Sequence, residues 1–161
     1  MNTRVSFEPA SPREVGQFSA GANTGESYLP SLVQFATGSA VYLLQVQQQD
    51  FSGPIREILS SERIVKVGVS VTDDLRNLKR LFEFDESSVL DLGKVAQRHG
   101  LKQTGLRNLA GMLLGMRIPK GAKTTSWAAR RLTDQQITYA ATDAWVCREL
   151  YLRFNELKMV G

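Results

Sequence analysis

One run of β-branched residues limits the fold more than any other feature of the chain. Residues 63–71 read RIVKVGVSV, a pattern expected of a strand that is buried within a sheet. Thr72 can then cap a helix, with Asp73 and Asp74 in its first turn, where acidic side chains favour the positive end of the helix dipole. A buried strand followed at once by a helix predicts an α/β arrangement.

The segments on either side extend that arrangement. Residues 15–30 are rich in Gly, Ser, Ala and Asn and are predicted to form a flexible loop rather than a packed element. Further strands are expected at residues 4–8, 31–36, 40–46 and 89–92, and further helices at 54–61, 106–114 and 133–157. The last helix opens with Thr133 and Gln136 at capping-box spacing. Because strands come first and then alternate with helices, the expected fold class is α/β with a mixed sheet.

Length and composition fit a single domain. With 161 residues and 42% hydrophobic content, residues 1–161 are expected to bury one core. Cys147 is the one cysteine, which excludes an internal disulfide and a thiolate zinc cluster and makes a reducing, cytoplasmic location the expectation. No apolar run approaches the roughly 20 residues of a membrane span, so no membrane partner is expected.

A long acid-free segment is a candidate phosphate-facing surface. Residues 92–133 contain no Asp or Glu but nine Lys and Arg residues. The same composition fits an ordinary solvated surface equally well. The candidate nucleic-acid contacts in this segment are Arg107, Lys120, Lys123 and Trp127. The lysines could instead be merely solvated, and Trp127 could pack against the domain.

Three residues carry the pattern of a catalytic site. Tyr139 and Asp143 lie four apart on the last predicted helix, so they project from one face. Asp74 lies just beyond the buried strand, at the edge where α/β sheets commonly place functional groups. Two carboxylates from different elements can share a divalent metal such as Mg²⁺ or Mn²⁺. Spacing alone also fits a structure without catalytic roles, in which Asp74 is simply a first-turn residue and Tyr139 a partly buried helix tyrosine.

The sequence around these residues is more specific than their spacing. The string SWAARRLTDQQITYAATDA, residues 126–144, resembles the third exonuclease motif of the 3′-to-5′ exonucleases related to RNase D and the Werner-syndrome exonuclease domain. The resemblance extends upstream through residues 65–69, which precede Asp74 as in the family's second motif, and through residues 90–92 and 105–109. It implies an RNase H-like fold of the DEDDy class, in which four acidic ligands hold two metals.

The same resemblance implies a role for each of the three residues. Asp74 would bind the metal on the leaving-group side, and Asp143 would bind the metal that activates water. Tyr139 would orient the attacking water. The metals would be Mg²⁺ or Mn²⁺, which prefer oxygen ligands.

The first family motif is degenerate in this chain. The family places Asp-x-Glu on its first strand, and the best alignment sets Glu8-Pro9-Ala10 against it. Glu8 would then be a displaced metal ligand, and Ala10 can bind nothing. Pro9 cannot donate to a sheet ladder. An incomplete two-metal site predicts weak or absent hydrolysis, since a group misplaced by about 1 Å can cost about 100-fold in rate.

The leading hypothesis is therefore an attenuated 3′-to-5′ exonuclease that acts on single-stranded or 3′-ended RNA or DNA. The alternative is a catalytically silent nucleic-acid-binding module that keeps the exonuclease fold. A protein-interaction scaffold that binds no nucleic acid fits the acid-free segment least well. The sequence leaves open the choice between RNA and DNA and the oligomeric state.

Overall fold

The computed structural model of the protein describes residues 15–21 as backbone and residues 29–119 and 126–160 in full. The strands are β1 (Val15–Gly21), β2 (Leu32–Ala36), β3 (Val41–Leu44), β4 (Val65–Gly68) and β5 (Val89–Asp91). The helices are α1 (Ser52–Ser60), α2 (Val71–Leu78), α3 (Leu92–Arg98), α4 (Leu106–Leu109), the π-helix η1 (Ala110–Leu114) and α5 (Asp134–Glu156).

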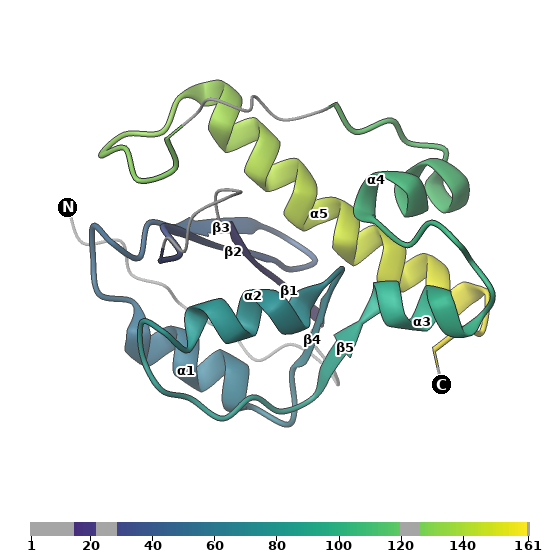
Figure 1. The fold of residues 1–161 in the computed structure, drawn as a ribbon, viewed down its shortest axis with the longest axis horizontal. Coiled ribbons are helices and arrows are strands. Elements are labelled where there is room, and N and C mark those ends of the chain that lie inside the picture. The colour runs from purple at the N-terminus through teal and green to yellow at the C-terminus, as the bar shows by residue number, and fades with distance from the viewer. Residues whose placement is uncertain (1–14, 22–28, 120–125, 161) are drawn as a thin grey trace.

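The strands form one mixed sheet in the order β3-β2-β1-β4-β5 (Figure 1). β1 pairs antiparallel with β2 and parallel with β4, and β5 continues the parallel part. β2 pairs antiparallel with β3, so the strands predicted at residues 31–36 and 40–46 form a hairpin. The α/β class with a mixed sheet is therefore confirmed.

The predicted loop at residues 15–30 is wrong for its first seven residues. Residues 15–21 form β1, the central strand of the sheet, between β2 and β4. Small residues such as Gly16, Ser19 and Gly21 gave this segment the composition of a loop, but pairing on both edges makes it a strand. The predicted strand at residues 4–8, including Glu8, lies outside the described residues.

Two hydrophobic clusters hold helices against the sheet. One joins β2 to α1 and α2 and is made of Val33, Phe35, Ile55, Leu59, Val71, Leu75, Leu78 and Phe84. The other joins β4 to α3, α4 and α5, and its buried members include Val67, Leu92, Val95, Leu109, Val146, Leu150 and Phe154. Burial of each such side chain contributes about 1.5–3 kcal/mol. Because α2 and α5 both also contact β1, the two clusters fix both helices that carry candidate site residues.

The turn between β4 and α2 differs from its prediction. α2 begins at Val71, so Thr72 lies inside the helix, and the cap position belongs to Ser70, which adopts a left-handed conformation with φ of 60°. Asp73 and Asp74 do lie in the first turn, as predicted. The backbone N–H of Ser70 donates to the Asp91 carboxylate at 3.2 Å, which ties this turn to the end of β5.

Helix α3 was not predicted. Asp91 caps it by accepting from the backbone N–H groups of Gly93 at 2.9 Å and Lys94 at 3.3 Å. The signal was present in the sequence, because Asp is a preferred N-cap residue and Leu92, Val95 and Ala96 repeat at helical spacing.

The last helix agrees closely with its prediction. Thr133 Oγ1 accepts from the backbone N–H of Gln136 at 3.2 Å, and the Gln136 side chain accepts from the backbone N–H of Thr133 at 2.9 Å, which completes the capping box. α4 runs directly into η1, and Gly115 ends it with φ of 65°, as expected of a glycine at a helix end. Within the described part of the chain, no helix has both the length and the apolar content to cross a membrane.

Lys66 is a fully buried cation in β4. Its Nζ donates to the backbone carbonyl of Ser61 at 2.6 Å. Ser61 follows α1, and the negative end of this helix dipole stabilises a positive charge. Burial nevertheless lowers the pKa of Lys66 to about 8. The folded state therefore disfavours the charged amine, and this cost is fully present below pH 8.

Replacing Lys66 by Met is expected to raise the melting temperature at pH 7 by about 3 °C, because an apolar side chain of similar volume removes a cost of about 1 kcal/mol. The gain should fade as the pH rises from about 8 towards the ordinary lysine pKa of 10.5, where the wild-type amine becomes neutral in both states. Thermal melts across this range provide the measurement. Lys102→Met, at an exposed position, is the matched control and should show no such trend.

Candidate functional site

Tyr139 and Asp143 form the centre of the candidate site. Both lie on α5, and both are partly buried. Burial raises the pKa of Asp143 to about 6, while a hydrogen bond from the Tyr139 hydroxyl and the nearby charge of Arg107 act in the opposite direction. The two side chains thus share one helix face, as predicted, and lie close enough for the Tyr139 hydroxyl to act on the Asp143 carboxyl.

Arg107 brings a second helix, α4, to this site. It lies on α4, which packs beside α5 (Figure 1). Its side chain is exposed, yet its charge acts on the Asp143 carboxylate. The acid-free composition of residues 92–133 marked Arg107 as a possible phosphate contact, but nothing in the sequence indicated that it would lie next to Asp143.

Trp127 packs against Tyr139. The two ring centroids are 6.2 Å apart and the ring planes are inclined by 41°, a geometry typical of favourable aromatic pairs. The segment that carries Trp127 is fixed from two sides: Gln136 donates to the backbone carbonyl of Ser126 at 3.2 Å, and Gln45 donates to that of Ala129 at 2.8 Å. Trp127 is half-buried, so its side chain packs against the domain and remains partly accessible to solvent.

The remaining acidic residues near this end of the sheet have different surroundings. Asp74 lies in the first turn of α2 and is partly buried. Its neighbour Asp73 is exposed and pairs with Arg76 at 3.0 Å. The Asp91 carboxylate accepts three backbone N–H groups, so its role is to join β5, α3 and the start of α2. Asp74, in the first turn of α2, stays the predicted metal ligand on this helix.

β1 supplies no carboxylate to this end of the sheet. Its sequence is VGQFSAG. Gln17 lies level with Val67 of β4 in the parallel register, and strand alternation then places residues 17, 19 and 21 on the face of Val67, which packs in the cluster under α5. The family's Asp-x-Glu motif has its two acidic residues two positions apart. At the carboxyl end of β1, the two residues with this spacing on this face are Ser19 and Gly21. The alternative position for the first family motif, Glu8-Pro9-Ala10, lies outside the described residues.

The described residues do not fit a two-metal centre. Mg²⁺ takes near-octahedral oxygen coordination, and no three His, Cys, Asp or Glu residues gather in a metal-binding arrangement within residues 29–119 and 126–160. The buried Asp143 carboxylate instead shares its surroundings with a tyrosine hydroxyl and a guanidinium. The expected ligand Glu8 lies outside the described residues.

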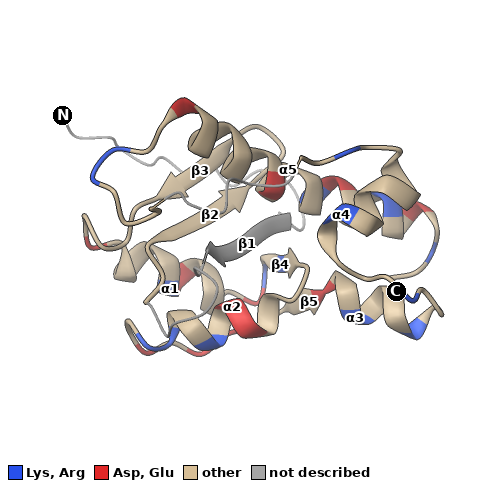
Figure 2. Ribbon diagram, turned by 45° about the horizontal axis from the view of Figure 1, so that its top comes forward, with Lys and Arg blue, Asp and Glu red and all other residues tan. Residues whose placement is uncertain are grey.

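Basic residues of the acid-free segment are exposed on the surface, some near this site and others, such as Arg98, remote from it. Figure 2 shows blue segments on α3, α4 and the chain between them. The described basic residues of the acid-free segment are all exposed: Lys94, Arg98, Lys102, Arg107, Arg117, Arg130 and Arg131. The expected contacts Lys120 and Lys123 lie outside the described residues.

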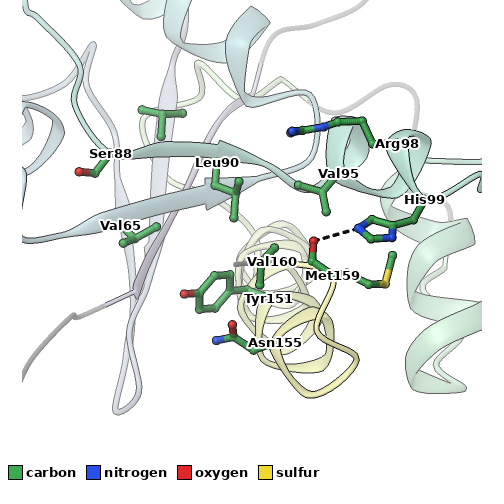
Figure 3. Close-up of a pocket in the computed structure, with 11 residues that line it drawn as sticks. Val65, Ser88, Leu90, Val95, Arg98, His99, Tyr151, Asn155, Met159 and Val160 are labelled. Atoms are coloured by element: carbon green, nitrogen blue, oxygen red, sulfur yellow. Dashed lines mark hydrogen bonds between the residues drawn. The ribbon is translucent and has the colours of Figure 1, made fainter.

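A pocket lies at the other end of α5, away from Tyr139 and Asp143. It has a volume of about 420 Å³ and lies between β4, β5, α3 and the last turns of α5 (Figure 3). His99 closes one side through a hydrogen bond from its ring to the Met159 carbonyl, with 3.0 Å between the two atoms. Tyr151 lines this pocket eight positions after Asp143, which is about 12 Å along a helix. Arg98 and His99 therefore belong to a different surface from the candidate site.

Comparison with known proteins identifies the fold. A family model described as 3′-5′ exonuclease matches residues 23–157. The chain belongs to this exonuclease family. The matched range begins just after β1, the strand that lacks acidic residues.

Relatives of this exonuclease domain include ribonuclease D from Haemophilus influenzae, which is 36% identical over 131 residues that cover 78% of this chain and 32% of the relative. DNA polymerase I from Aquifex aeolicus is 29% identical over 126 residues, which cover 78% of this chain and 21% of the polymerase. The chain thus spans between a fifth and a third of the length of these relatives.

Solved structures agree on the RNase H-like exonuclease fold. RNase D from Escherichia coli has a TM-score of 0.73 and 22% identity, and the match covers 90% of this chain and 40% of that one. NrnC from Brucella melitensis has a TM-score of 0.75 and 20% identity, with 91% and 76% covered. NrnC has been solved with bound pGG and with bound Mg²⁺. The resemblance expected from residues 126–144 is therefore confirmed at the level of the family and the fold.

Proposed function

We propose that this domain acts on the 3′ ends of single-stranded RNA or DNA as an attenuated 3′-to-5′ exonuclease. The observation that carries the proposal is the pair of Tyr139 and Asp143 on one face of α5, with Trp127 against the Tyr139 ring and Arg107 on the neighbouring helix α4. These groups combine a hydroxyl that can orient water, a carboxylate and a cation suited to phosphate. Family membership supports the assignment of this site to phosphodiester chemistry.

Each group has a distinct part in the proposal. Arg107 holds a backbone phosphate through its planar guanidinium, which matches phosphate oxygens in pairs. Tyr139 orients water at that phosphate, and Trp127 supports the phenol ring. Asp143 and Asp74 are the carboxylates that remain as ligands for Mg²⁺ or Mn²⁺. Because β1 adds none, cleavage is expected to be slow.

A second candidate function is strand binding without cleavage. The absence of Asp and Glu from β1 favours it, because the family's first motif supplies half of the acidic ligands. Trp127 and the exposed residues Arg107, Arg130 and Arg131 remain able to bind a strand in either case.

Incubation of 5′-labelled single-stranded RNA and DNA with the protein and Mn²⁺ tests the proposal. We expect slow shortening from the 3′ end, and a loss of at least about 10-fold in Tyr139→Phe, which keeps the ring but removes the water-orienting hydroxyl. Tyr151→Phe, on the same helix at the remote pocket, is the matched control and should be unaffected. Binding with no shortening of either strand would contradict the exonuclease assignment and favour the second candidate.

A further inference from the structure

We propose that the Tyr139–Asp143 site binds a nucleic-acid strand without a divalent metal, with Arg107 supplying positive charge that carboxylate-rich exonuclease sites take from their metals. The inference rests on the proposed function in one respect, namely that this site receives a strand. It goes beyond that function by separating binding from any metal-dependent cleavage.

The first support is the small number of carboxylates that the described residues bring to the site. Several carboxylates close together repel one another and a strand phosphate unless cations neutralise them. β1 has no acidic residue, and Asp91 is engaged by three backbone N–H groups. Asp73 is paired with Arg76 on the exposed face of α2. The described residues therefore bring less negative charge to the site than the four acidic ligands of the family would, and a metal would have less charge to neutralise.

The second support is the position of Arg107. It is exposed, and it lies on a helix that packs beside Asp143. The buried residues Leu109 and Ala110 anchor this helix in the cluster under α5. A guanidinium remains charged at every physiological pH and presents a fork of donors to phosphate oxygens. Arg107 can thus balance Asp143 and still reach a phosphate.

The third support is an aromatic surface that works without metal. Trp127 lies against Tyr139, and the segment that carries it is tied down by Gln45 and Gln136. The exposed Arg130 and Arg131 belong to the same segment. Base stacking on a fixed ring contributes about 1–3 kcal/mol per base, and phosphate contacts add salt-dependent affinity.

Fluorescence anisotropy of a labelled single strand with a free 3′ hydroxyl, measured in EDTA and in Mg²⁺, tests the proposal. We expect affinities within about threefold of each other in the two buffers. Arg107→Gln should weaken binding at least about 10-fold in both and reduce the salt slope by about 0.7, whereas Arg107→Lys should retain part of the affinity. Arg98→Gln removes the same charge at the remote pocket and should leave binding almost unchanged.

Two results would overturn the inference while leaving the proposed function in place. One is binding that is lost in EDTA and restored by Mg²⁺. The other is an equal effect of Arg107→Gln and Arg98→Gln, which would mean that Arg107 contributes only to overall charge. Absence of binding in both buffers would overturn the inference and the proposed function together. This outcome differs from the first one because Mg²⁺ would not restore binding.

Discussion

Replacing Ser19 by Asp and Gly21 by Glu is expected to increase the rate of 3′-to-5′ hydrolysis in Mn²⁺ by at least about 100-fold. The register of β1 against β4 and strand alternation place these two positions on the face that lies under α5, and we propose them as the counterparts of the two acidic residues of the family's first motif. Two added carboxylates would complete an oxygen donor set with Asp74 and Asp143. A rate gain of this size is what restoring a misplaced or missing catalytic group can give. Release of nucleotides from a 5′-labelled strand provides the measurement.

A neutral pair at the same positions is the matched control for this gain. Ser19→Asn plus Gly21→Gln adds side chains of similar size without charge and should leave hydrolysis at the wild-type level. Equal melting temperatures of the two double variants would show that both are folded. A folded acidic variant that gains nothing over the neutral pair would contradict the assignment of β1 as the incomplete wall of the site.

Asp143→Asn is expected to stabilise the protein at pH 7 and above, by as much as about 3 kcal/mol. Burial raises the pKa of Asp143 from 3.8 to about 6, so the folded state disfavours the ionised carboxylate, and each unit corresponds to about 1.4 kcal/mol. The cost is absent below about pH 4, grows as the pH rises from about 4 to 6, and is constant above. The variant should therefore melt several degrees higher than the wild type at pH 7.5 and at the same temperature near pH 4.

The melts should be made in EDTA, so that no cation stabilises the carboxylate. Asp85→Asn, at an exposed position, is the matched control and should shift the melting temperature little at any pH. A variant that is less stable than the wild type at pH 7.5 would show that neighbouring groups stabilise the ionised Asp143 carboxylate more than burial destabilises it. The same variant is expected to have lost hydrolysis.

Much of the fold could be predicted from local patterns in the sequence. The β-branched run at residues 63–71 contains β4, and the capping-box spacing of Thr133 and Gln136 marks the start of α5. Tyr139 and Asp143 lie on one face because a helix has 3.6 residues per turn. These features depend on residues near one another in the chain, so periodicity and capping chemistry predicted them.

The central strand could not be predicted in the same way. β1 is rich in small residues, and only its pairing with β2 and β4, which are remote in sequence, makes it a strand. The loop-like composition of residues 15–30 is also why the sequence alignment set the first motif against Glu8-Pro9-Ala10. The proximity of Arg107 to Asp143 likewise depends on the packing of α4 beside α5, which no local pattern records.

The central claim is that a strand binds where Tyr139, Asp143 and Trp127 meet. The chain has two tryptophans, so Trp145→Phe leaves Trp127 as the single emitter, in contact with Tyr139. Titration with a 3′-ended single strand should quench Trp127 emission in parallel with the rise in anisotropy of the labelled strand. Saturating anisotropy with unchanged Trp127 emission would place the strand elsewhere on the molecule and contradict the claim.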